Sequence, residues 1–130
     1  MNDADFLTAL ERCTLPEAEF THAAHVRAAY LYLCGGSFGQ AIDRMAAVIR
    51  RYATSLGKPD RYHDTITVGF LALIRARLCE RGDASGWRCF AAANPDLLDR
   101  GLLLRHYPPQ QLQSALARRV FVLPQALADS

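Results

Sequence analysis

Two short motifs hold the residues of this chain that are best suited to chemistry. The first is Thr21-His22-Ala23-Ala24-His25 and the second is Tyr62-His63-Asp64-Thr65-Ile66-Thr67, and together they contain three of the four histidines. An imidazole titrates near neutral pH, so it can accept a proton, donate one or bind a metal ion. Each motif stands directly before apolar, helix-forming sequence. We therefore expect any chemistry of this chain to lie in these two motifs.

The spacing of the first motif places both of its histidines on one face of a helix. Residues three apart are neighbours on a helix surface, and His22 also continues an inward stripe through Val26 and Leu33. His63 occupies the same position at the start of a later helix. Antiparallel packing of the two helices would keep His63 away from His22 and His25, whereas parallel or steeply crossed packing would bring all three together. We favour convergence, because a whole helix separates the two motifs.

A converged set of three imidazoles with one open position would suit zinc, copper or non-haem iron. On this interpretation His22, His25 and His63 are the metal ligands. A site with two histidines and one carboxylate, from Glu19 or Asp64, is the variant left open. The Glu-x-x-His spacing of a di-iron bundle occurs once, where such a bundle uses it twice.

A metal-free site would use the same motifs as an acid–base pair. The positive end of a helix lowers the pKa of a nearby histidine and favours its neutral, proton-accepting form. The residues of such a site would be His22, His63, Tyr62 and Asp64 as catalytic groups, with Thr65, Thr67 and Arg27 as substrate-binding groups. The third interpretation is structural, in which the histidines and threonines satisfy buried helix ends. The sequence leaves open whether the protein is an enzyme.

Length and composition predict one globular domain over residues 1–130. Hydrophobic residues make up 51% of the chain and charged residues 22%, a balance typical of folded rather than disordered proteins. The net charge of +2 is too small to predict a nucleic-acid or membrane partner. No apolar run approaches the roughly 20 residues that cross a bilayer.

The cysteines and the N-terminus predict a cytoplasmic protein. The first residues, Met1-Asn2-Asp3-Ala4-Asp5, are acidic and lack the basic and apolar regions of a signal peptide. The four cysteines form no Cys-x-x-Cys pair, so reduced thiols in a bacterial-type cytoplasm are the favoured interpretation.

Hydrophobic periodicity is helical almost throughout, which predicts an all-α fold: a compact bundle of about five to seven helices. Ser37 followed by Gln40 predicts a capping box, and Gly57 suits the position after a helix end. The other predicted N-caps are Thr21, Asp60 and Asn94, the last followed by a proline. The predicted helices span 3–12, 22–34, 38–56, 61–81, 86–93, 95–105 and 109–119.

Four motifs together resemble a group of small bacterial helical proteins that have no assigned activity. The motifs are Phe20-Thr21-His22-x-x-His25, Tyr62-His63-x-Thr65-x-Thr67, Asn94-Pro95-x-Leu97-Leu98-Asp99 and Ala117-Arg118-Arg119-x-Phe121-Val122-x-Pro124. The resemblance implies a stand-alone bacterial helical protein, and it carries over no reaction.

The leading functional hypothesis is a small soluble helical protein with a histidine-lined pocket. This pocket would bind or transform a small molecule, with or without a transition metal (zinc, copper or iron). The alternative is a non-enzymatic interaction module with structural histidines. Its basis is the apolar sequence of the last third, Leu102-Leu103-Leu104 and Val120-Phe121-Val122-Leu123, which a homodimer could bury.

Overall fold

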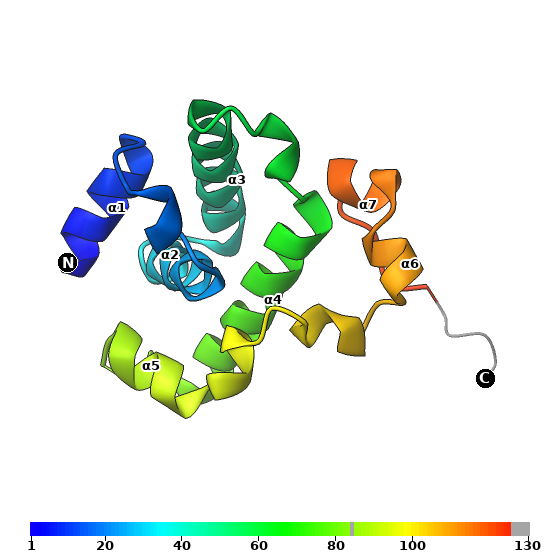
Figure 1. Ribbon diagram of the computed structural model, residues 1–130. Helices are drawn as coiled ribbons and strands as arrows, with labels where there is room; N and C mark the ends of the chain where they lie inside the picture. The colour runs from blue at the N-terminus through cyan, green and yellow to red at the C-terminus, as the bar shows by residue number, and fades with distance from the viewer. Residues whose placement is uncertain (84, 126–130) are drawn as a thin grey trace.

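The chain folds into packed helices, as the sequence predicts (Figure 1). The structure is a computed structural model that describes residues 1–83 and 85–125, and these residues form no β-strand. The α-helices are α1 (Asp3–Glu11), α2 (His22–Cys34), α3 (Phe38–Ser55), α4 (Asp64–Arg81), α5 (Trp87–Ala93), α6 (Pro109–Leu112) and α7 (Ala115–Arg119). The 3-10 turns are η1 (Glu17–Glu19), η2 (Pro59–Arg61), η3 (Pro95–Leu98) and η4 (Leu102–Arg105). The all-α prediction is confirmed.

Helices α2, α3 and α4 form the centre of the molecule, and each packs against the other two. In Figure 1 α2 is seen nearly end-on while α3 and α4 run across the view, so α2 crosses both steeply. Helix α5 and turn η3 pack on α2, and α7 packs on α4. No helix of the described residues is both long and apolar enough to cross a membrane.

Three of the helix ends that the sequence marks with capping residues are confirmed. Thr21 Oγ1 accepts a hydrogen bond from the Ala24 amide at 3.3 Å at the start of α2. Ser37 and Gln40 form both halves of the capping box of α3. Gly57 follows the end of α3 with a φ of +72°, a conformation that glycine adopts without strain.

The start of α4 differs from the prediction. Asp60 lies in turn η2 and does not cap α4, which begins at Asp64 rather than at residue 61. The N-cap is His63, whose Nδ1 accepts a hydrogen bond from the Ile66 amide at 3.1 Å. A histidine can take this role because its neutral ring has one unprotonated nitrogen, which accepts as a serine or asparagine oxygen does.

The helices in the last third of the chain are shorter and more often interrupted than predicted. The expected helix over 95–105 is two 3-10 turns, interrupted where the Asp99 carboxylate accepts from the Gly101 amide. The expected helix over 109–119 divides into α6 and α7, because Ser114 caps the start of α7. Asn94 lies at the predicted restart, but its side chain donates to the Phe90 carbonyl instead of capping η3.

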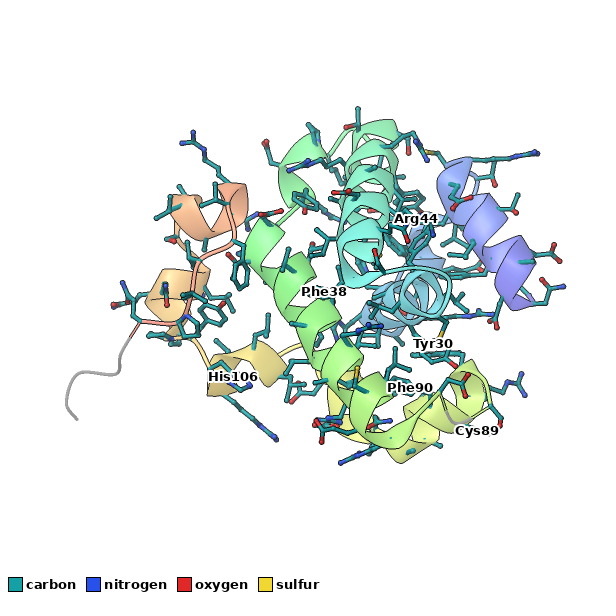
Figure 2. All side chains as sticks on the ribbon, turned by 180° about the vertical axis from the view of Figure 1, so that it is seen from behind. Tyr30, Phe38, Arg44, Cys89, Phe90 and His106 are labelled. Atoms are coloured by element: carbon teal, nitrogen blue, oxygen red, sulfur yellow. The ribbon has the colours of Figure 1, made fainter. Side chains whose placement is uncertain are left out.

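Buried apolar side chains from α1 to α5 and from turns η3 and η4 form the core. Tyr30 of α2 and Phe90 of α5 lie side by side there, with ring centroids 4.8 Å apart (Figure 2). Leu103 of η4 packs closely against α4, since a Cβ at Gly69 would lie 3.1 Å from its methyl groups. The core therefore includes Leu102 and Leu103, which the sequence assigned to a dimer surface. Leu104 of the same run is exposed.

Candidate functional site

A hollow of about 270 Å³ lies where the three central helices meet. Its walls are mostly apolar, and its polar lining groups include His22 and His25 of α2, Thr67 of α4 and Arg100. The apolar lining consists of Val26 and Ala29 of α2, Met45 and Ile49 of α3, and Ile66 and Phe70 of α4. The sequence predicted a pocket containing His22, His25 and Thr67, and the structure brings these three residues together.

A second hollow of about 460 Å³ adjoins the first. Four residues line both hollows, namely His22, His25, Ile49 and Arg100. The rest of the second hollow includes charged and polar side chains, among them Glu17, Arg61 and Tyr52. The two histidines thus stand at the junction between an apolar hollow and a more polar one.

His22 is the first residue of α2, and a distant carbonyl holds its ring. Its Nε2 donates a hydrogen bond to the carbonyl oxygen of Leu97, 75 residues further along the chain, at 3.1 Å. The ring also packs edge-on against Phe70, with centroids 4.8 Å apart. Because Nε2 carries the proton in this arrangement, the Nδ1 of a neutral His22 has an unshared electron pair.

His25 lies one turn further along α2 and is held in the opposite tautomer. Its Nδ1 donates to the Thr21 carbonyl at 3.0 Å, within the first turn of the helix. The ring stacks on Phe20 with a centroid separation of 3.8 Å and an interplanar angle of 19°. The Nε2 of a neutral His25 is therefore the nitrogen with the unshared pair.

Both of these nitrogens are free to accept a hydrogen bond. Neither His22 Nδ1 nor His25 Nε2 has a hydrogen-bond partner among the described residues, and none of these residues has a fully buried side-chain N or O atom without a partner. The two nitrogens therefore retain some accessible surface. Backbone carbonyls fix the orientation of each ring, so both are pre-organised as acceptors.

Burial lowers the pKa of both histidines below the usual 6.5. The positive charge of Arg100 lowers both pKa values further, and that of His25 is also lowered by His22. At neutral pH the pair is consequently uncharged and able to accept protons. Arg100 is exposed and lies between η3 and η4. The sequence did not mark Arg100 as a site residue, because an arginine on an irregular segment belongs to no motif or hydrophobic stripe.

His63 does not join this pair. Its Nδ1 caps α4 and its Nε2 donates to the Leu112 carbonyl at 2.6 Å, so both ring nitrogens are used within the fold. The described residues contain no group of three or more His, Cys, Asp or Glu side chains that could hold a metal ion. The predicted three-histidine metal site is therefore not formed, nor is the variant with Glu19 or Asp64.

Four other residues proposed from the sequence lie outside the two hollows. Tyr62 donates to the Asp64 carboxylate at 2.6 Å, beneath the Arg50 guanidinium. The Thr65 hydroxyl donates to the Val120 carbonyl and so fastens the C-terminal segment to α4. Arg27 forms an ion pair with Asp3 at 2.7 Å. The structure does not gather these four, or His63, around His22 and His25. The remaining histidine, His106, is exposed on the segment after η4 (Figure 2).

We expect protein stability to fall as the pH drops below about 6.5. Unfolding restores the usual pKa of His22 and His25, so below that pH the unfolded chain binds more protons than the folded one. Above about pH 6.5 the stabilisation from the two neutral histidines is fully present. As the pH falls, this stabilisation is lost until the pH is below the folded-state pKa values, where the loss levels off. Urea denaturation from about pH 5 to pH 7.5 measures this dependence. Replacing His22 with Gln and His25 with Asn together should flatten it, and an unchanged slope would contradict the assignment.

Comparisons of this chain with models of protein families, with curated proteins and with solved structures give no match.

Proposed function

We propose that this chain binds a small molecule in the hollow between α2, α3 and α4, and that His22 and His25 accept hydrogen bonds or protons from it. The observation that supports this most directly is the pair of neutral imidazoles, each fixed by a backbone carbonyl and each with its other nitrogen accessible. Apolar walls with a few convergent polar groups and perturbed pKa values are typical of ligand sites.

The size of the hollow favours a small ligand. Its volume of about 270 Å³ is slightly below that of pockets for drug-sized molecules. The walls come from three helices of the core, so their positions are fixed by packing and not by a loop.

Proton transfer is the chemistry that the pair supports best. A general base must have an accessible nitrogen, an orientation fixed by a second group and a pKa near or below the working pH. His22 and His25 meet these three conditions. A catalytic zinc site uses three protein ligands, and this pair supplies two, so the proposal includes no metal. Whether the bound molecule is also transformed depends on whether it presents an acidic proton to either ring.

Benzene tests whether the hollow accepts an apolar ligand, because apolar cavities bind it. In methyl NMR spectra we expect benzene to shift Val26, Met45 and Ile49, which line the hollow. Ala29→Leu should abolish the shifts by filling the space, whereas the matched change Ala72→Leu, on the exposed face of α4, should not.

Ala29 is buried, so Ile66→Trp at the partly exposed wall of the hollow provides a second filling variant. Shifts scattered over the surface, or shifts that persist in both filling variants, would refute the proposed site.

We place this function in the reducing cytoplasm of a bacterium. The support is the resemblance described above and the three exposed thiols of Cys34, Cys79 and Cys89, which an oxidising compartment would not keep reduced.

The alternative, an interaction module, remains a prediction. It is supported by the exposed apolar side chains of Leu116, Val120, Phe121 and Leu123 near the C-terminus. In that alternative the histidines are structural, and the accessible nitrogens of the half-buried His22 and His25 have no role, which is why we favour ligand binding.

A further inference from the structure

The two adjoining hollows differ in the polarity of their walls, and this difference constrains the chemistry of a ligand that would occupy both. Beyond the four shared residues, the first hollow is lined by apolar side chains and by Thr67, whose hydroxyl donates to the His63 carbonyl. The second includes an acidic, a basic and a phenolic side chain from Glu17, Arg61 and Tyr52. A molecule that occupies both hollows must have one apolar end and one polar end, because an unpartnered polar group in the first hollow would lose its hydrogen bonds to water.

The charges at the junction favour an anionic group. Glu17 is already matched, since its carboxylate forms ion pairs with Lys58 at 2.5 Å and with Arg61 at 3.3 Å. Arg100 has no ion pair or hydrogen bond among the described residues, and the neighbouring Asp99 carboxylate accepts instead from the Gly101 amide. A guanidinium with five donors and no partner is suited to a carboxylate.

The histidines require a hydrogen-bond donor at the same junction. His22 Nδ1 and His25 Nε2 accept hydrogen bonds, and a carboxylate has no proton to offer them. A hydroxyl group supplies the missing donor. Because Arg100 lines the same junction as the two rings, the hydroxyl and the carboxylate must lie close together in the ligand.

We propose that the ligand is an apolar-tailed hydroxycarboxylate. Its hydrocarbon tail lies among Val26, Met45 and Phe70, its hydroxyl donates to His22 or His25, and its carboxylate binds Arg100. This inference rests on the proposed function and names the class of molecule that the site selects.

Four probe compounds test the contribution of each part of this ligand to binding affinity, measured by isothermal titration calorimetry at neutral pH. They are 2-hydroxyoctanoate, which has all three parts; octanoate, which lacks the hydroxyl; 1-octanol, which lacks the carboxylate; and lactate, which lacks the tail. We expect 2-hydroxyoctanoate to bind most tightly, octanoate and 1-octanol to bind more weakly, and lactate to show no binding at the same concentrations.

Two substitutions assign the polar contacts. Arg100→Gln should weaken 2-hydroxyoctanoate binding by about tenfold and leave 1-octanol unchanged. Arg105→Gln is the matched control, because Arg105 is also an exposed arginine but lines neither hollow. His25→Phe keeps a ring that can stack on Phe20 and removes an acceptor, so it should reduce the preference for 2-hydroxyoctanoate over octanoate.

The outcomes distinguish this inference from the proposed function. Equal binding of 1-octanol and 2-hydroxyoctanoate, or equal losses from Arg100→Gln and Arg105→Gln, would overturn the hydroxycarboxylate while the benzene shifts remain. If benzene and all four probes fail to bind, the proposed function fails as well. The inference is supported if 2-hydroxyoctanoate binds more tightly than lactate and if Arg100→Gln weakens its binding while Arg105→Gln does not.

Discussion

Replacing His63 with alanine should lower the free energy of unfolding by about 2–4 kcal/mol. His63 is 7% exposed and uses both ring nitrogens, one to cap α4 and one to bind the Leu112 carbonyl of α6. Alanine removes the cap, leaves the Leu112 carbonyl without its protein donor and opens a cavity. Urea denaturation monitored by circular dichroism measures the loss.

The matched control is His63→Asn. Asparagine is among the strongest N-caps, but its side chain is too short to reach Leu112 as well. This variant should therefore recover the capping part of the loss and not the rest. Amide hydrogen exchange should become faster in α6 in both variants, since the His63–Leu112 hydrogen bond joins α6 to the start of α4. A value for His63→Ala within about 0.5 kcal/mol of the wild type would show that the cap is dispensable.

The helix ends that the sequence predicted correctly depend on neighbours within a few residues. Thr21 and Ser37 cap their own helices, and Gly57 adopts the conformation that ends α3. Such contacts follow from residue type and spacing alone. The start of α4 was missed because Asp60, three residues before His63, is itself a favourable N-cap residue. An aspartate is the commoner N-cap, and the His63 ring is favoured only once α6 supplies the Leu112 carbonyl.

The site was only partly predictable, because its decisive contacts join distant parts of the chain. The spacing of His22 and His25 placed both on one face of α2, and both line the hollow. The partner that fixes His22, however, is a carbonyl in a 3-10 turn 75 residues away. No local pattern marks that contact. The steep crossing of α2 and α4 in Figure 1 was among the geometries expected to bring His63 close. The capping role of that ring prevents it from joining the pair.

The second large loss of stability is expected from substitution of Asn94. This residue anchors turn η3, whose Leu97 carbonyl holds the His22 ring. Asn94 is 1% exposed, and its amide nitrogen donates to the Phe90 carbonyl at 2.9 Å. Its oxygen accepts from Arg77 at 3.0 Å and from Arg81 at 2.8 Å. Arg77 also forms a two-pronged ion pair with Asp96 of η3. This cluster fastens η3 to α4 and thereby positions the carbonyl of Leu97.

Asn94→Ala should lower the free energy of unfolding by about 2–4 kcal/mol, since three hydrogen bonds in a buried site are lost together. Asn94→Asp keeps the acceptor for both arginines and loses only the donor to Phe90, so it should cost less.

The informative readout of Asn94→Ala is the tautomer of each histidine, measured by nitrogen-15 NMR. Looser anchoring of η3 should weaken the His22–Leu97 hydrogen bond and reduce the population of His22 protonated at Nε2. His25 should not change, because its carbonyl partner, Thr21, lies within the first turn of the same helix. His25 thus serves as an internal control within one sample. Equal shifts of both rings would indicate general loosening of the core, and the cluster would then have no specific part in orienting His22. A change confined to His22 would show that the contacts of Asn94 with Arg77 and Arg81 of α4 help to orient the His22 ring for accepting a proton.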